Sequence, residues 1–374
     1  MVQKRYIYDC DLWPNLEWDR GGVEDVRAKV YLARGLLYGK LNALGFSVQN
    51  DLLLDSVSDE IKASSQIEGE LLNAESVRSS VAKRLGLEMA GFENVNSDHY
   101  TEGVVDMALD AARNYAQPLT KERLFNWHAA LFPTGRSGNY RINVGVYRTE
   151  VMEIVSGPLG KERVHYTAPG PERVAPEMSA FLDWIDTEDK TDPFVKTGLA
   201  HLRFETIHPF DDGNGRIGRA IADRMLARAE DNANRYYSLS AQMLAERKAY
   251  YNALEEAQAG TGDVTEWLVW FLACLERSIR ASERRLDAAI AKALLFERWR
   301  GIPMNERQLR MVNMLIDGFD GKLRTSKWAT ITKCSQDTAL RDIDDLVAKG
   351  ILEREAGGGR STSYALCKGR TTIQ

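Results

Sequence analysis

The sequence predicts a mainly α-helical protein, and three observations support this fold class. Apolar residues recur at helical spacing along most of the chain, for example in 194–207 and 216–229. One interior stretch, 151–166, combines two short β-prone runs with a Gly/Pro turn, which indicates a hairpin. The tail, 302–374, has short amphipathic segments and a glycine-rich turn. The chain is therefore expected to hold a helical core, one hairpin and a small C-terminal domain.

Four segments follow one another along the chain. Residues 1–95 are a helical N-terminal region, 96–285 a central core, 286–301 a connecting helix and 302–374 a C-terminal domain. The helices expected within the first three segments show apolar or aromatic stripes that are typical of buried faces. These helices are 26–44, 194–207, 216–229, 238–254, 265–272 and 282–299.

The tail has the element order of a winged helix-turn-helix domain. The spacing predicts helices over 305–316, 325–332 and 337–349, followed by a strand over 351–354 and a return over 362–366. Such a domain can lay its third helix in the major groove of DNA. That helix carries Asp337, Asp342, Asp344 and Asp345 against two basic residues, and DNA phosphates would repel it. Protein docking or structural support is therefore favoured over DNA binding, which stays open as the alternative.

Composition excludes several classes of protein. Hydrophobic residues make up 44% and charged residues 28%, which is typical of a soluble globular chain. A formal net charge of −5 argues against a generally basic nucleic-acid-binding protein, though not against a local patch. The four cysteines show no C-x-x-C spacing, so a zinc site is not expected. Neither a signal-peptide core nor a long apolar run occurs, and we expect a cytoplasmic protein without a membrane partner.

The strongest functional signal is the run His208-Pro-Phe-Asp-Asp-Gly-Asn-Gly-Arg-Ile-Gly-Arg219. It lies between two expected helices, and its glycines allow backbone N–H groups at a helix N-terminus to approach an anion. Arg216 and Arg219 can each form paired hydrogen bonds with a phosphate. Asp212 is a hard oxygen donor of the kind that Mg²⁺ accepts. His208 is placed to take a proton near neutral pH. The run therefore indicates a site that handles phosphates.

Two other phosphate motifs are not supported. Residues 213–218 fit the pattern G-x-G-x-x-G of dinucleotide-binding proteins, but that pattern requires a preceding strand in a βαβ unit. The segment before residue 213 is expected to be helical. The P-loop pattern G-x-x-x-x-G-K-[ST] does not occur in the sequence.

The run from His208 to Arg219 resembles the signature of Fic proteins, H-P-F-x-[DE]-G-N-G-R-x-x-R, at every fixed position. The resemblance implies an all-helical core with a hairpin flap, and the transfer of AMP from ATP to a Ser, Thr or Tyr hydroxyl of a protein. It implies that His208 is the base and that Asp212 holds Mg²⁺. The implied phosphate-binding residues are Gly213, Asn214, Gly215, Arg216 and Arg219.

A second motif, Ser64-Ser-Gln-Ile-Glu68-Gly69, resembles the inhibitory motif [ST]-x-x-x-E-[GN] of Fic proteins. Ser64 and Glu68 are four residues apart and share one face of a helix. The resemblance implies that Glu68 pairs with Arg219 and occupies the site of the ATP γ-phosphate, because a carboxylate competes with phosphate for one guanidinium group. It also leaves open a bifunctional enzyme, in which the glutamate positions a water that removes AMP.

The hairpin resembles the flap that clamps the target segment of Fic proteins as an added strand. The flap residues expected at the site are Val151, Met152, Glu153, Ile154 and Val155. Tyr250 and Tyr251 resemble positions near the adenine pocket, and a packing role is equally compatible with them. The implied partners are an unnamed target protein, the chain itself through self-modification, and a homo-oligomer.

Overall fold

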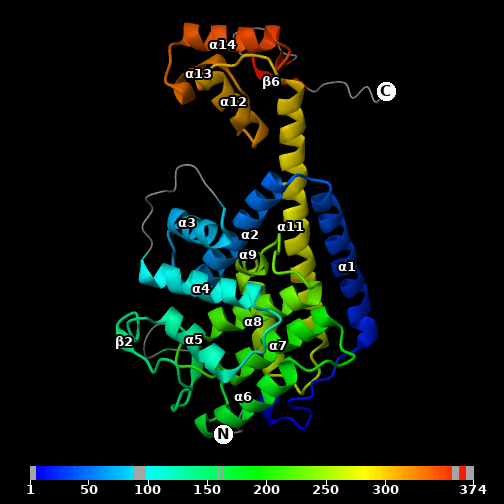
Figure 1. Ribbon diagram of the computed structural model, residues 1–374, viewed down its shortest axis with the longest axis vertical. Coiled ribbons are helices and arrows are strands. Elements are labelled where there is room, and N and C mark those ends of the chain that lie inside the picture. The colour runs from blue at the N-terminus through cyan, green and yellow to red at the C-terminus, as the bar shows by residue number, and fades with distance from the viewer. Residues whose placement is uncertain (1–5, 88–97, 158–160, 162, 356–361, 368–374) are drawn as a thin grey trace. The chain divides into compact units, whose positions relative to one another are not determined.

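The computed structural model describes residues 6–87, 98–157, 161, 163–355 and 362–367. The chain divides into two compact units, residues 1–284 and 285–374. The fold is mainly helical, as the sequence predicts, and Figure 1 follows the helices from α1 to α14. Within the described part of the chain, none of the helices combines the length and the apolar character that a membrane crossing needs.

Unit 1 begins with a 3₁₀ turn, η1 (Ile7–Asp9), and three helices that precede the core. These are α1 (Arg20–Asn42), α2 (Phe46–Ile67) and α3 (Ala74–Leu85). The side chains of Asp19 and Asn73 accept hydrogen bonds from first-turn N–H groups of α1 and α3. Gly86 ends α3 in the left-handed conformation, at φ 70°. Helix α2 packs against α3, α8 and α9, which fixes the segment that carries Glu68.

Seven helices of the described core of unit 1 pack together, and two of them form a central pair. The seven helices are α4 (His99–Arg113), α5 (Lys121–Leu131), α6 (Pro171–Ile185), α7 (Pro193–Ile207), α8 (Asn214–Glu230), α9 (Leu239–Ala245) and α10 (Arg247–Gln258). Helices α7 and α8 pack against each other, and every residue from Phe194 to Ile207 is buried. Gly103 lets α4 approach α5, because a Cβ there would lie 2.0 Å from the carbonyl oxygen of Ala130. The pair α7–α8 is thus a fixed scaffold for the loop between them.

The structure differs from the sequence prediction at three places before residue 299. The helix expected over 238–254 is two helices, separated at Glu246, whose φ is −111°. The segments 265–272 and 282–299 belong to one continuous helix of 34 residues, α11 (Thr265–Arg298). A small hairpin of β1 (Arg136–Ser137) and β2 (Tyr140–Arg141) was not expected. Glu246 accepts two hydrogen bonds from Arg277, a contact between distant segments that the local pattern does not reveal.

The second hairpin consists of β3 (Glu153–Ser156) and β4 (Arg163–Thr167). It begins two residues after the expected Val151, and Val151 and Met152 lie before the strand. The antiparallel register pairs Ile154 with Tyr166 but Val155 with Val164. One residue of β4, His165, is therefore an extra residue in a β-bulge, which bends the strand and redirects the side chain.

Beyond the end of α11, the described residues of unit 2 form three helices and a hairpin in the order expected from the sequence. Its elements are α12 (Glu306–Ile316), α13 (Thr325–Thr332), α14 (Gln336–Ala348), β5 (Leu352–Arg354) and β6 (Tyr364–Leu366). Leu323, before α13, forms an antiparallel bridge with Tyr364. The helices enclose a core around Trp328, Met311 and Ile343, all of which are fully buried.

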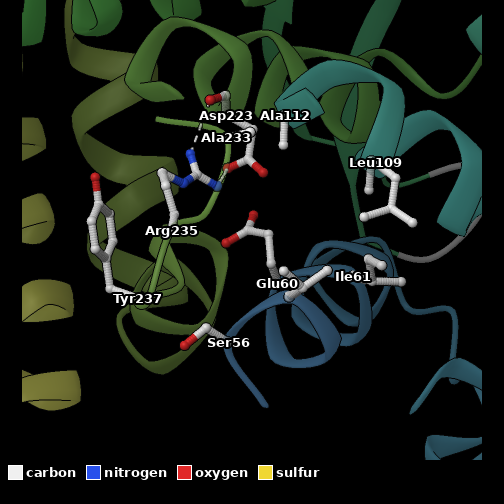
Figure 2. Close-up of a pocket in the computed structure, with 11 residues that line it drawn as sticks. Ser56, Glu60, Ile61, Leu109, Ala112, Asp223, Ala233, Arg235 and Tyr237 are labelled. Carbon is white, nitrogen blue, oxygen red and sulfur yellow. Dashed lines mark hydrogen bonds and ion pairs between the residues drawn. The ribbon is translucent and has the colours of Figure 1, made fainter. Parts of the chain in front are cut away.

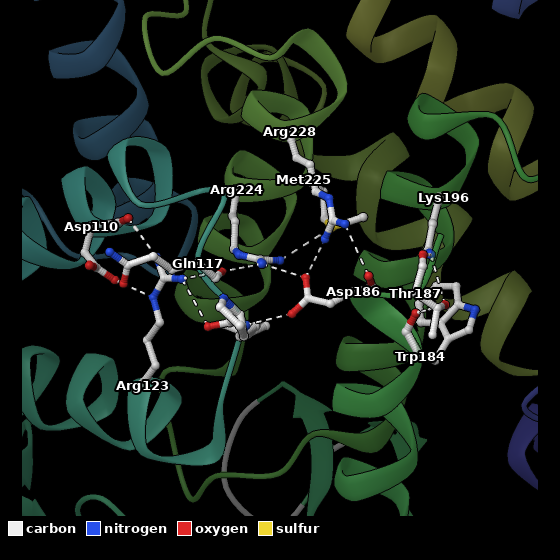
Figure 3. Close-up of polar contacts among 12 residues, drawn as sticks. Asp110, Gln117, Arg123, Trp184, Asp186, Thr187, Lys196, Arg224, Met225 and Arg228 are labelled. Atoms are coloured by element: carbon white, nitrogen blue, oxygen red, sulfur yellow. Dashed lines mark hydrogen bonds and ion pairs between the residues drawn. The ribbon is translucent and has the colours of Figure 1, made fainter. Parts of the chain in front are cut away.

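A polar network fixes α8 against the end of α6 (Figure 3). Asp186 accepts hydrogen bonds from Arg224 (2.6 Å), Arg228 (2.7 Å) and the backbone N–H of Leu119 (2.8 Å). The Arg224 side chain is fully buried, so its charge depends on Asp186 for compensation.

We expect Asp186→Ala to lower the free energy of unfolding by about 3 kcal/mol, because it leaves the buried Arg224 guanidinium without its carboxylate. Urea unfolding followed by circular dichroism measures this change. Asp183→Ala is the control, since Asp183 is an exposed acid on the same helix. Equal stability of the two variants would contradict the role assigned to Asp186.

Candidate active site

The loop between α7 and α8 brings the signature residues together. It begins at His208, which ends α7 in the left-handed conformation at φ 51° and donates its backbone N–H to Phe204 (2.9 Å). A left-handed conformation at a residue other than glycine costs about 1 kcal/mol and persists only where the surroundings hold it. Gly213, at φ 83°, precedes the first residue of α8. The sharp turn at each end of the loop aims the N-terminus of α8 back toward His208.

Side chains of the loop itself hold its shape. The Asn214 amide accepts a hydrogen bond from the backbone N–H of Phe210 (2.9 Å) and donates one to its carbonyl (2.8 Å). His128 stacks on Phe210 with ring centroids 4.3 Å apart, and its Nε2 lies 3.1 Å from the carbonyl oxygen of Asp212. The Asn214 side chain is thus engaged with the backbone of the loop.

Arg148 is a structural link that the sequence analysis did not identify. It is 2% exposed and donates to the carbonyl oxygens of His208 (2.8 Å), Glu150 (2.8 Å) and Pro169 (2.5 Å). Its backbone N–H donates to Pro209 (2.9 Å). Arg148 therefore ties the loop to both ends of the β3–β4 hairpin. An isolated arginine before a hairpin has no distinguishing pattern, so nothing in the sequence pointed to this role.

A cavity of about 570 Å³ lies over the loop. The loop, the hairpin, α10 and the end of α2 all contribute to its lining. From the expected site residues, the lining includes Glu68, Ile154, Val155, His208, Asp212, Gly213, Asn214, Gly215, Tyr250 and Tyr251. It does not include Ser64, Gly69, Val151, Met152, Glu153, Arg216 or Arg219. Ser156, His165, Glu205 and Glu255 line it as well, and the sequence analysis assigned them no role there.

The two tyrosines have different surroundings. Tyr250 is 1% exposed, and its hydroxyl lies 2.9 Å from Nε2 of His201, so it is largely packed. Tyr251 is 38% exposed, with the Arg247 guanidinium over its ring. Tyr251 is therefore the more accessible aromatic surface beside the cavity.

His208 is held in its neutral form. Burial lowers the pKa of His208 to about 4. Its Nδ1 lies 3.3 Å from the carbonyl oxygen of Glu205, which can only accept, so Nδ1 carries the proton. The Nε2 lone pair is then available for a proton above that pKa. This is the protonation state that a general base requires.

Glu205 is a buried carboxyl beside His208 on α7. Burial raises the pKa of Glu205 to about 8, and its Oε1 has no hydrogen-bond partner among the described residues. The ordinary glutamate value is near 4.3, so the folded protein binds more protons than the unfolded chain between these two values.

We expect the contribution of Glu205 to stability to decrease as pH rises from about 5 to 8, because its carboxyl is neutral below its folded-state pKa and ionises as the pH passes that value. Glu205→Gln removes this contribution, so its melting temperature should fall less steeply over the same range. Thermal unfolding at several pH values measures both slopes. Parallel curves for the two proteins would mean that Glu205 is ionised in the folded state.

Glu68, which lines the cavity, forms an ion pair with Arg219, which lies outside the lining. Arg219 donates from Nη2 to Glu68 Oε1 (2.7 Å) and to the Ser64 carbonyl (2.8 Å), and from Nε to the Ser64 hydroxyl (2.9 Å). Gly215 makes this approach possible, because a Cβ there would lie 2.2 Å from Glu68 Oε1. The Glu68 carboxylate thus lies at the N-terminus of α8, where an anion is favoured.

The helix that carries Glu68 is anchored two turns earlier by Glu60, which Figure 2 shows beside Arg235 and Asp223. Glu60 is 6% exposed and accepts hydrogen bonds from the Ser238 hydroxyl (2.8 Å) and from the N–H of Ser240 (3.0 Å). Nearby, Arg235 forms an ion pair with Asp223 of α8. Burial raises the pKa of Asp223 to about 7. These contacts connect α2, α8 and α9, so the Glu68 carboxylate is held by a rigid helix.

Asp212 presents a carboxylate that is 40% exposed. It accepts hydrogen bonds from the Gly213 N–H (2.5 Å) and from the Ser137 hydroxyl, and Arg216 lies 3.5 Å away. No group of three or more metal-ligating side chains occurs among residues that the structure describes. A single accessible carboxylate fits Mg²⁺, which is commonly held by one or two carboxylates together with substrate phosphates and water.

Comparison with known proteins gives two family matches. Residues 118–226 match the Fic/DOC family, and residues 6–87 match a domain of unknown function (DUF4172). The chain is 32% identical over 118 residues to a protein adenylyltransferase Fic of Nematostella vectensis. This aligned segment covers 31% of this chain and 26% of that protein. A probable protein adenylyltransferase of Aquifex aeolicus is 33% identical over 102 residues, 27% of this chain and 29% of that protein. The chain thus matches little more than a quarter of the length of these relatives.

One solved structure covers almost the whole chain. A Fic family protein from Desulfovibrio desulfuricans G20 superposes with a TM-score of 0.53 at 19% identity, over 94% of this chain and 98% of that one. The two proteins therefore share a fold.

Proposed function

We propose that this chain, which contains a domain of the Fic/DOC family, transfers AMP from ATP to a hydroxyl group of a protein. The observation that carries the proposal is the neutral, partly buried His208 in the same cavity as the N-terminal turn of α8. A base and an anion-binding backbone facing one cavity are what nucleotidyl transfer requires. The names of the similar adenylyltransferases support the same activity.

The residues would act in the following way. The acceptor hydroxyl gives its proton to Nε2 of His208 while its oxygen bonds to the α-phosphorus of ATP. The bond from that phosphorus to the oxygen bridging to the β-phosphate breaks, and pyrophosphate leaves. The N–H group of Gly215, in the first turn of α8, would stabilise the charge on the phosphates. Arg216 and Arg219 would bind the outer phosphates, and Asn214 keeps the loop in shape.

Asp212 would hold Mg²⁺, with Ser137 and Arg216 orienting its carboxylate. Bound Mg²⁺ would neutralise charge on the phosphates. The cavity volume of about 570 Å³ suits a nucleotide. Tyr251 offers the accessible aromatic face for the base, and Ile154 and Val155 on β3 provide the strand on which a target segment could pair.

The enzyme is also autoinhibited in this proposal. Glu68 occupies the Nη2 atom of Arg219 that a γ-phosphate would use, and Ser64 engages the same guanidinium. The Nη1 atom of Arg219 has no partner within the described residues, so the arginine keeps capacity for a ligand. A role of Glu68 in removing AMP remains compatible with its place in the cavity lining.

Two labelled forms of ATP test the proposed reaction. Transfer of AMP incorporates label from the α-phosphate into protein and none from the γ-phosphate. The experiment uses Glu68→Gly protein with Mg²⁺, alone and with a cell extract as the source of targets. Incorporation from the γ-phosphate would show phosphoryl transfer instead, and no incorporation from either label would overturn the proposal.

DNA binding by unit 2 is a second candidate. It is favoured because acidic side chains on α14 are paired with basic side chains of the same protein. Asp342 is buried against Arg307 and Asn305, Asp344 pairs with Arg354, and Asp345 pairs with Lys349. Residues 285–374 contain 16 lysines and arginines against 11 aspartates and glutamates. The repulsion expected from an acidic helix is therefore reduced.

Among the described residues of unit 2, Lys333 at the end of α13 and Arg341 on α14 are exposed basic residues without a carboxylate partner. Fluorescence anisotropy of the full chain with a mixed-sequence DNA duplex at low salt tests this candidate. We expect Arg341→Ala to weaken binding and to lower the salt slope by about 1. Arg300→Ala, which removes an exposed arginine that pairs with Glu297, is the control. Absence of binding at low salt would exclude DNA as a partner.

A further inference from the structure

The β3–β4 hairpin carries a hydrogen-bonded chain of three side chains. The Ser156 hydroxyl lies 2.6 Å from Nε2 of His165, and Nδ1 of His165 lies 2.7 Å from Oε2 of Glu255 on α10. A serine, a histidine and a carboxylate joined in this order form the arrangement that activates a serine oxygen as a nucleophile.

The backbone supports this arrangement at both ends. His165 is the extra residue of the bulge in β4, and bulges redirect side chains beside active sites. Arg163 forms a second bond to the same carboxylate, from Nη2 to Glu255 Oε1 (2.8 Å). Partial burial alone would raise the pKa of Glu255. The hydrogen bonds from His165 and Arg163 outweigh this effect and lower the pKa. The ionised carboxylate orients the imidazole so that Nδ1 carries its proton and Nε2 accepts from serine.

Ser156 also lies where a nucleotide would be. Ser156, His165 and Glu255 line the same cavity of about 570 Å³ as His208 and Gly215. Ser156 is exposed, so its hydroxyl is accessible from the cavity. The hairpin therefore presents an activated hydroxyl to the site at which a phosphate would be held.

We propose that Ser156 is a site at which this chain transfers AMP to itself, with His165 as the base and Glu255 as a positioning residue. The proposal rests on the proposed function and names an acceptor for it. Ser156 Oγ forms a bond to the α-phosphorus of ATP, and its proton passes to Nε2 of His165. The bond between the α-phosphorus and the oxygen that bridges to the β-phosphate breaks, and pyrophosphate leaves.

Peptide mass spectrometry of the full chain after incubation with ATP and Mg²⁺ tests the proposal. The Glu68→Gly background is used so that the inhibitory carboxylate is absent. We expect AMP on the peptide that contains Ser156, with loss of that adduct in Ser156→Ala and its retention in Ser156→Thr. Thr149→Ala is the matched control, since Thr149 is an exposed hydroxyl before the same hairpin and does not line the cavity.

His165→Ala separates a base from a structural contact. We expect this change to lower the rate of Ser156 labelling about 100-fold. Added imidazole should restore part of the rate, which a purely structural loss would not permit. Glu255→Gln should give a smaller loss than His165→Ala, because it weakens the orientation and leaves the base in place.

The outcomes separate this proposal from the proposed function. AMP found only at residues other than Ser156 would overturn the self-modification site and leave AMP transfer intact. Normal Ser156 labelling in His165→Ala would overturn the role of the three-residue chain. AMP on no peptide of the chain and on no protein of an added cell extract would overturn AMP transfer and, with it, this proposal.

Discussion

We expect His208→Ala to lower the rate of AMP transfer to a target protein by about 100- to 10,000-fold, the range associated with losing a general base. His208 is the residue of the cavity loop that can act as a base. Its imidazole is uncharged, and its backbone is held in a fixed conformation. Burial lowers its pKa to about 4, and the contact with Glu205 leaves Nε2 as the acceptor. The initial rate of incorporation of α-labelled ATP into the target protein, counted separately from label on the chain itself, measures the effect in the Glu68→Gly background.

A control variant and a measurement of nucleotide binding distinguish loss of the base from loss of the loop structure. His99→Ala is the control, because His99 is an exposed histidine at the start of α4. Nucleotide binding by His208→Ala, followed by calorimetry, should stay close to that of the parent, since the phosphate-binding backbone is unchanged. A variant that keeps its transfer rate would remove His208 as the base, whereas one that loses nucleotide binding would point to a collapsed loop.

The second large effect is an increase. Glu68→Gly should raise AMP transfer about 10- to 100-fold, which corresponds to the loss of one hydrogen bond between charged groups, about 1.5–3 kcal/mol. The change frees Nη2 of Arg219 and clears the space above Gly215. Glu70→Gly is the matched control, because Glu70 is an exposed acid two residues further along.

A double variant links the two expectations. Glu68→Gly/His208→Ala should be as inactive as His208→Ala alone, because an open phosphate site cannot replace the base. If Glu68→Gly were no more active than the unaltered chain while both bound ATP equally, Glu68 would not be inhibitory. Loss of AMP from a labelled target in the unaltered chain but not in Glu68→Gly would indicate the removal activity.

The local sequence pattern was sufficient to predict the helices and strands whose conformation depends mainly on their own residues. The helices over 193–207 and 325–332 and the hairpin of unit 2 lie within two residues of their expected bounds. The signature residues are adjacent in sequence, so their place in the α7–α8 loop and the first two turns of α8 follows from the local sequence. Periodicity failed where a distant contact decides the backbone, as at Glu246, where Arg277 holds the junction between α9 and α10.

The residues that were missed share one property, which is that their partners are remote. Arg148 bonds to His208, 60 residues further along, and His165 bonds to Glu255 at a separation of 90. No spacing rule connects such positions in a single sequence. The acids of α14 illustrate the same limit of sequence-based prediction. Their charge is evident from the sequence, but the basic partners that other elements supply are not.

The clearance at Gly215 has a genetic consequence. The same missing side chain admits the Glu68 carboxylate and leaves the backbone open to a phosphate, so a larger residue there disturbs the restraint and the activity together. Spontaneous mutants selected for higher activity should therefore carry changes in α2 and its end, at Ser64, Glu68 or Gly69. Changes at position 215 should instead be found among mutants selected for loss of activity, even when no other position of the chain is altered.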